Sequence, residues 1–148
     1  MSGLTDPMHH HHKHCDELFA DAEAAAAEKD WAHAKMSLGA FHGDLETHFR
    51  TEEEVLFPAF EAATGMTGGP TQMMRYEHAQ MRELVARMEE AMREQDGEAF
   101  AGDAETLLIL MQQHNMKEEN ILYPMIDRSL AGQAGSLGPV LRERLASA

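Results

Sequence analysis

The chain has 148 residues, with 12 basic and 26 acidic side chains and a formal net charge of −14. This charge would repel phosphate backbones and anionic lipid surfaces, which argues against nucleic acid or a membrane as a partner. Cys15 is the only cysteine and cannot form an internal disulfide, and no stretch approaches the roughly 18 apolar residues of a membrane span. We therefore expect a cytoplasmic protein, with residues 1–148 forming one domain.

Helical periodicity covers almost the whole chain. Alanine, methionine, glutamate and leucine are common and β-branched residues are scarce, which favours helix. Asp6 before Pro7 is typical of a helix start, Asp30 can cap a second helix, and the glycine-rich residues 64–70 form the clearest linker. The predicted helices cover residues 7–28, 30–63, 71–95 and 98–130, with a short fifth helix at 139–146. Tight turns make neighbouring helices antiparallel, so the predicted fold is all-α: an up-down-up-down four-helix bundle with a short C-terminal extra helix.

A weak internal repeat selects six residues of metal-binding type. It is clearest between residues 48–58 and 114–124, which are separated by an offset of 66 residues. Of the histidines at residues 9–14, only His12 has another histidine 66 residues further along the chain. The repeat pairs His12 with His78, His48 with His114, and Glu52 with Glu118.

The geometry of an antiparallel bundle gives a second argument for the same residues. The midpoints between successive members of the four histidines fall at residues 30, 63 and 96, at or beside the predicted turns. The four side chains should therefore meet at one level, and Glu52 and Glu118 follow their own histidines by about one helical turn. Buried carboxylates need a compensating charge, and mixed imidazole and carboxylate donors suit iron or manganese better than structural zinc. The predicted metal ligands are His12, His48, Glu52, His78, His114 and Glu118.

These motifs make residues 7–130 similar to the hemerythrin family, in its HHE cation-binding branch. The resemblance implies a non-haem di-iron centre, oxo- or hydroxo-bridged when oxidised, in which Glu52 and Glu118 bridge the ions. Manganese or zinc could replace the iron. The matching residues are His12 before Cys15-Asp16-Glu17-Leu18-Phe19, His48 with Glu52, Glu53 and Leu56-Phe57-Pro58, Glu77-His78, and His114 with Glu118 and Leu122-Tyr123-Pro124.

Two differences from the oxygen-carrying hemerythrins bear on function. Those proteins place a histidine where this chain has Arg82, and an aspartate five residues after the last histidine, where this chain has Glu118 after four. In both respects the chain is similar to HHE proteins linked to iron sensing, nitric oxide and peroxide responses, and iron–sulfur repair. We therefore expect a binding protein, more than an enzyme, for dioxygen, nitric oxide or peroxide in sensing, storage or detoxification. The alternatives are an enzyme that decomposes peroxide or reduces nitric oxide, and a protein that senses or donates iron.

Other polar residues near the motifs have simpler interpretations. We expect the remaining histidines of the N-terminal run to lie around or beyond the core face, although any one of them could replace His12. Cys15 should be a small buried apolar group. His33 and His42 are interpreted as surface groups or as partners of ligand side chains. Glu53, Glu54 and Glu119 are interpreted as a solvated acidic face, although one of them could instead bond to a ligand imidazole. Tyr76 and Tyr123 are interpreted as packing residues, with redox chemistry as the alternative.

One further prediction concerns a charged pair at equivalent positions of the repeat. Asp16 and Arg82 each lie one turn after a predicted ligand histidine and carry opposite charges. Because an unpaired buried charge is costly, we expect these side chains to approach each other, or each other's ligand histidines, across the bundle. The alternative is that Arg82 extends outward with no coupling to Asp16.

Overall fold

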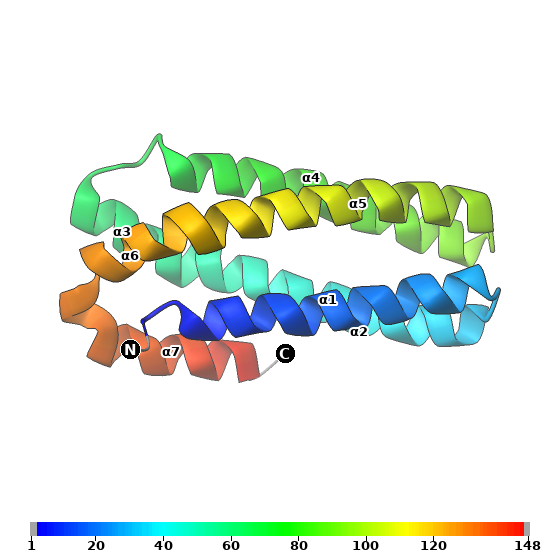
Figure 1. Ribbon diagram of the computed structural model, residues 1–148, viewed down its shortest axis with the longest axis horizontal. Helices are drawn as coiled ribbons and strands as arrows, with labels where there is room; N and C mark the ends of the chain where they lie inside the picture. Colours follow the sequence, from blue (N-terminus) through cyan, green and yellow to red (C-terminus); the bar gives the residue numbers. More distant parts are fainter. Residues whose placement is uncertain (1–2, 147–148) are drawn as a thin grey trace.

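The computed structural model describes residues 3–146, and all regular structure within that range is helical. Four long helices alternate in direction along the bundle (Figure 1): α1 (Asp6–Ala27), α2 (Trp31–Thr51), α4 (Pro70–Arg93) and α5 (Gly97–Lys117). The helix α2 continues through a π-helical turn (Glu52–Leu56) into α3 (Phe57–Thr64), and α5 continues through a second π-helical turn (Glu118–Leu122) into α6 (Tyr123–Ser129). A short 3-10 turn (Ala131–Gln133) leads to α7 (Ala134–Ala146), which packs against α1 and α2. The predicted bundle with a C-terminal extra helix is confirmed.

The two tight turns of the bundle are equivalent in the repeat. Asp30 accepts a hydrogen bond from the backbone N–H of His33, and Asp96 accepts one from Ala99, so each aspartate caps the helix that follows it. The residue before each cap has a positive φ, 61° at Lys29 and 54° at Gln95. Both turns lie at the same end of the bundle (Figure 1), which places the repeated motifs at one level in the middle.

The C-terminal helix starts earlier than predicted. We expected it to begin at residue 139, after a glycine-rich stretch, but α7 begins at Ala134 and includes Pro139. Proline in the second turn removes its own hydrogen bond to the Gly135 carbonyl. Leu141 is fully buried in the core, and the burial of such a side chain contributes about 1.5–3 kcal/mol, which helps to offset that loss.

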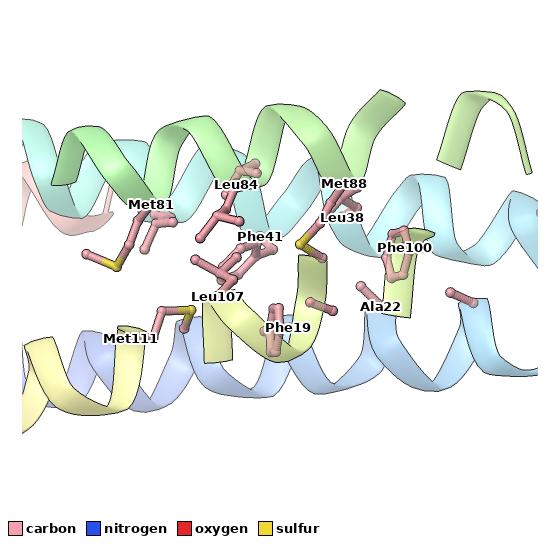
Figure 2. Close-up of a cluster of buried hydrophobic side chains, with 14 of the residues drawn as sticks. Phe19, Ala22, Leu38, Phe41, Met81, Leu84, Met88, Phe100, Leu107 and Met111 are labelled. Atoms are coloured by element: carbon pink, nitrogen blue, oxygen red, sulfur yellow. The ribbon is translucent and has the colours of Figure 1, made fainter. Parts of the chain in front are cut away.

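The apolar core forms two clusters, one on each side of the histidine level. The first cluster lies toward the tight turns (Figure 2) and includes Phe19, Leu38, Phe41, Met88, Phe100 and Leu107. The second lies toward α3, α6 and α7 and includes Met8, Leu56, Phe60, Ile126 and Leu141. The polar residues between these clusters are thereby shielded from water. Within residues 3–146, no helix combines the length and the apolar character needed to cross a membrane.

Candidate metal centre

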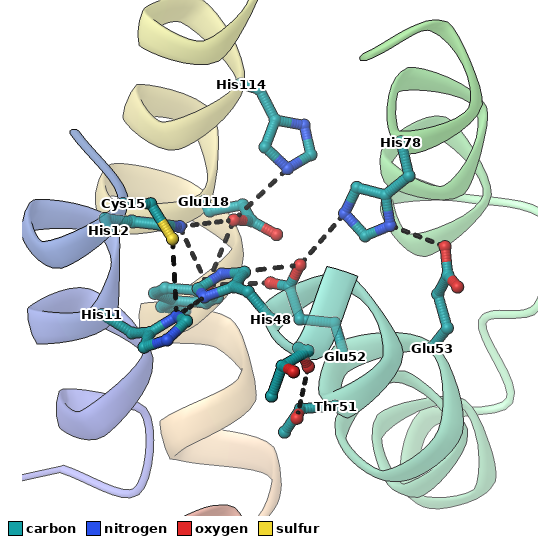
Figure 3. Close-up of polar contacts among 12 residues, drawn as sticks. His11, His12, Cys15, His48, Thr51, Glu52, Glu53, His78, His114 and Glu118 are labelled. Atoms are coloured by element: carbon teal, nitrogen blue, oxygen red, sulfur yellow. Dashed lines mark hydrogen bonds and ion pairs between the residues drawn. The ribbon is translucent and has the colours of Figure 1, made fainter. Parts of the chain in front are cut away.

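The six predicted ligands come together in the middle of the bundle (Figure 3), with His12 5 % exposed and the other five at 2 % or less. Their ligand atoms form two groups, and within each group all atoms lie within 4.8 Å of one another. Glu118 belongs to both groups, so its carboxylate can reach two cations. The first group is Glu52, His78, His114 and Glu118, and the second is His12, His48 and Glu118.

The imidazole Nε2 atoms face the two carboxylates. The Nε2 atom of His78 lies 3.0 Å from Glu52 Oε1, and that of His12 lies 3.0 Å from Glu118 Oε1. The Nε2 atom of His114 lies 3.3 Å from the same Glu118 oxygen. Four aromatic nitrogens and two carboxylates on four helices therefore enclose one small volume.

Among residues 3–146, four buried side-chain atoms have no hydrogen-bond partner, and all four belong to the first group: Glu52 Oε1, His78 Nε2, His114 Nε2 and Glu118 Oε2. The short distance between His78 and Glu52 lacks the alignment that a hydrogen bond requires. A buried polar atom without a partner costs about 1–3 kcal/mol, so four in one place are expensive. One cation would compensate all four atoms, and the residues present therefore fit a metal ion.

Acidic side chains bind three of the four ligand imidazoles at Nδ1, the ring nitrogen that points away from the centre. Each carboxylate accepts a hydrogen bond from Nδ1, which turns Nε2 toward the centre, as is common behind metal-bound histidines. The prediction that Glu53 and Glu119 form a solvated face was wrong, whereas Glu54 is exposed and pairs with Arg144. The pairs are His12 with Glu119 at 2.6 Å, His78 with Glu53 at 2.7 Å, and His114 with Glu77 at 2.8 Å.

The fourth imidazole, His48, has a histidine behind it. His11 Nδ1 lies 2.9 Å from His48 Nδ1, and the two rings stack with their centroids 5.1 Å apart. His11 is only 8 % exposed, which corrects its expected position away from the core, whereas His9, His10 and His14 are exposed. The repeat offers a signal for this contact, because His11 occupies the position equivalent to Glu77. Cys15 is buried as predicted, 3.8 Å from His11 Nδ1, and burial raises the pKa of its thiol.

Titratable groups at equivalent positions of the repeat have different pKa values because their burial and their charged neighbours differ. Burial holds the pKa of His48 well below its usual value, with His12 adding to the effect, and burial lowers the pKa of His11 to about 4. At His114 burial opposes protonation, but Glu118 and Glu77 outweigh it and raise the pKa to about 10. Burial, reinforced by repulsion from Glu118, raises the pKa of Glu52 to about 7.

Tyr123 contributes a hydroxyl group to the centre. Its single hydroxyl hydrogen is shared between Glu52 Oε2 at 2.8 Å and Glu118 Oε1 at 3.1 Å, and its ring stacks on His12. The prediction that Tyr123 only packs was therefore wrong, whereas Tyr76 is 64 % exposed. Burial and the two carboxylates raise the pKa of Tyr123 well above its usual value, so the hydroxyl stays a donor.

The π-helical turns explain why Tyr123 was missed. Five residues along a regular α-helix place Tyr123 about 140° around the axis from Glu118. In the structure the backbone N–H of Tyr123 donates to the Glu118 carbonyl, an i→i+5 bond that brings the side chain back toward the centre. Phe57 makes the same bond to Glu52 at the equivalent position. The proline that follows each of these residues has no N–H to continue regular α-helical bonding.

The predicted contact between Asp16 and Arg82 does not form. Arg82 donates to Glu46 at 3.0 Å and to Glu53 at 2.9 and 3.0 Å, and its guanidinium lies over the ring of Phe49. Asp16 is exposed on α1. The helices α1 and α4 are diagonal in the bundle, since each packs against α2 and α5, and the two equivalent positions therefore face different sides.

Comparison with known proteins agrees with this geometry. The family model for the hemerythrin HHE cation-binding domain matches residues 3–126, which is most of the chain. No protein of curated function and no solved structure shows significant similarity to the chain. The matched segment contains all six predicted ligands.

Proposed function

The chain belongs to the hemerythrin family of HHE cation-binding domains, and from this premise we propose that it holds two non-haem iron ions in its bundle. We propose further that it binds dioxygen, another small diatomic molecule or peroxide, for sensing, storage or detoxification in the cytoplasm. The observation that carries this proposal is the set of two ligand groups joined by Glu118, with four buried atoms that lack hydrogen-bond partners.

The donor set supports iron. His78, His114, Glu52 and Glu118 would hold one ion, and His12 and His48 with Glu118 would hold the other. Such mixed nitrogen and oxygen donors suit iron or manganese, and the groups lack the thiolates of many structural zinc sites. The second group has fewer protein donors than the first, which leaves more room there for a small ligand.

The surrounding residues would prepare the site for such a ligand. Iron bound there would supply redox chemistry and an open coordination position. The outer carboxylates Glu53, Glu77 and Glu119 fix the imidazoles, and the two apolar clusters exclude bulk water. The Tyr123 hydroxyl provides a hydrogen-bond donor between the carboxylates, close to both groups.

Metal analysis followed by gas binding tests the proposal. The purified protein, reconstituted anaerobically with ferrous iron, should contain two ions per chain. Separate additions of dioxygen, nitric oxide and peroxide to the reduced protein should then change its optical spectrum, and a stable reversible spectrum would identify the ligand. A chain that binds no iron under these conditions, or iron that responds to none of the three, would overturn the proposal.

Peroxide decomposition is the second candidate, and Tyr123 favours it. A buried hydroxyl that stays protonated can hydrogen-bond to an oxygen atom of peroxide while the carboxylates nearby remain acceptors. The reaction converts two molecules of hydrogen peroxide into two of water and one of dioxygen. Many turnovers in the parent, and far fewer in Tyr123→Phe with equal iron content, would support the enzyme over the binding protein.

A further inference from the structure

The repeat relates two faces of the bundle that cover the candidate metal centre from outside. One face lies between α2 and α4, and the other lies between α5 and α1. Four positions on the first face have equivalents on the second at the 66-residue offset: Glu46 with Gln112, Phe49 with Asn115, Glu53 with Glu119, and Arg82 with Asp16.

The face between α2 and α4 is sealed. The ring of Phe49 is 2 % exposed and stacks on His78, with the centroids 3.9 Å apart and the planes within 15°. The guanidinium of Arg82 lies 5.2 Å from the centre of the Phe49 ring on the outside. The same guanidinium binds both oxygens of Glu53, the carboxylate that holds His78. A double charge-assisted bond of this kind fixes both partners, so His78 is held firmly.

The face between α1 and α5 is open. The equivalent positions there line a surface pocket of about 420 Å³, together with Met116 and Asn120. Asn115 stands in place of the Phe49 ring, and Asp16 stands in place of the Arg82 clamp. Glu119 holds His12 through one oxygen, and within the described residues 3–146 its other oxygen has only a long contact of 3.6 Å to His9, a histidine with its side chain 55 % exposed.

We propose that this pocket, called the Asp16–Glu119 pocket below, is the port through which metal cations enter and leave the centre. The inference rests on the proposed di-metal function and adds an order of exchange. The ion of the His12, His48 and Glu118 group leaves first, and the ion beside the sealed face stays longer.

The charge of the pocket and the weaker anchoring of Glu119 support this order of exchange. Asp16 and Glu119 make the pocket acidic, and such a pocket attracts cations in an already acidic protein. Glu119 lines the pocket and bonds directly to His12, so a movement of its carboxylate frees the imidazole to turn away from Glu118. The equivalent movement at Glu53 would require the bonds to Arg82 to break first.

The experiment introduces the residues that seal the α2–α4 face at the equivalent positions of the α1–α5 face. The parent protein is loaded with cobalt(II), its ion content is measured, and excess chelator is added while bound cobalt is followed by its visible spectrum. We expect a fast release of one ion and a slow release of the second. Asp16→Arg, which supplies a clamp for Glu119, should slow the fast phase about tenfold, the factor expected for one charge-assisted bond. Adding Gln112→Glu and Asn115→Phe completes the copied seal and should slow it further.

Two controls separate the port from general effects of charge. Glu17→Arg makes the same charge change on the exposed side of α1, outside the pocket, and should leave both phases unchanged. Arg82→Gln removes the existing clamp and should speed the slow phase alone.

The two hypotheses fail in different ways. Fewer than two bound ions in the parent would contradict the proposed di-metal function and, with it, the order of exchange. Two ions released at one rate, or an unchanged fast phase in both Asp16→Arg and the triple variant, would overturn the port alone.

Discussion

The two halves of the candidate centre have the same ligand types and different supports. In the half that contains His78 and His114, carboxylates stand behind both imidazoles. In the half that contains His12 and His48, one carboxylate is replaced by the neutral ring of His11. The equivalent aromatic residues also differ by one hydroxyl group, since Tyr123 stands where the other half has Phe57.

The comparison shows how a repeated sequence motif can produce two unlike halves of one candidate metal centre. A carboxylate behind an imidazole makes it a stronger ligand, whereas a neutral histidine does so less. Burial and, after it, His12 lower the pKa of His48, whereas at His114 the carboxylates of Glu118 and Glu77 outweigh burial, so the exchange of Glu77 for His11 contributes to the opposite pKa shifts. Chemical asymmetry therefore arises here from the outer residues as well as from the unequal number of donors in the two ligand groups.

The largest expected effect comes from Glu118, the residue that belongs to both ligand groups. Glu118→Ala should remove both ions, because each group loses a donor. Glu52→Ala should retain the ion held by His12 and His48. Metal content per chain, with circular dichroism to show that the helices remain, measures the difference, and His9→Ala serves as the exposed control. Full metal retention in Glu118→Ala would contradict the assignment.

The metal-free protein should lose stability as the pH rises from about 7 to 10. His114 has a folded pKa of about 10, above the ordinary value of 6.5, so its protonated form stabilises the fold. That contribution is fully present below pH 6.5 and is lost as the pH rises through about 10. Melting temperatures across this range measure it, and His114→Gln should flatten the curve. A melting temperature that rises over this range would contradict the shift.

The metal-loaded protein, in contrast, should be sensitive to low pH, because it should lose its metal there. Ligand histidines must be neutral and ligand glutamates ionised, so protons compete with metal. Bound metal should therefore fall as the pH is lowered below the ordinary histidine range, and equilibrium dialysis at successive pH values measures the loss. Constant occupancy down to the ordinary glutamate range would show that imidazole ligation is wrong.

A carboxylate at residue 11 should make the two halves more alike. His11→Glu places an acid behind His48, as Glu77 stands behind His114, and should raise the pKa of His48 in the metal-free protein. Nitrogen NMR of the imidazole rings measures the shift. His10→Glu adds the same charge at an exposed neighbouring position and should have little effect on His48. An equal response to the two substitutions would mean that the contact between His11 and His48 does not control the pKa.

The smallest expected effect comes from the hydroxyl that distinguishes Tyr123 from Phe57. Tyr123→Phe removes the hydroxyl hydrogen shared between two buried carboxylates and should cost about 1–3 kcal/mol in the metal-free protein. Denaturant unfolding measures this cost. Tyr76→Phe, at a position 64 % exposed, should leave the free energy of unfolding unchanged. Equal stabilities of the parent and Tyr123→Phe would show that the hydroxyl bonds contribute nothing.

The sequence alone was enough to predict the bundle and six of the side chains that meet at its centre. Breakers and caps such as Asp30 and Asp96 act within a few residues, so they mark the turns without knowledge of the fold. Once the turns are known, helical period and the 66-residue repeat determine which side chains share a level. His12 and Glu118, for example, were placed together although they lie far apart in the sequence.

The tertiary structure decided which residues hydrogen-bond to those side chains from outside the centre. The π-helical turns moved Tyr123 onto the centre, and a regular helical period does not anticipate them. Arg82 bound Glu46 and Glu53 because α1 and α4 are diagonal, a relation that the repeat does not contain. The residues that face the core recur with the helical period, so they can be predicted from the sequence of a single helix. The partner of an imidazole's second nitrogen depends on side chains from another helix, and only packing brings those together.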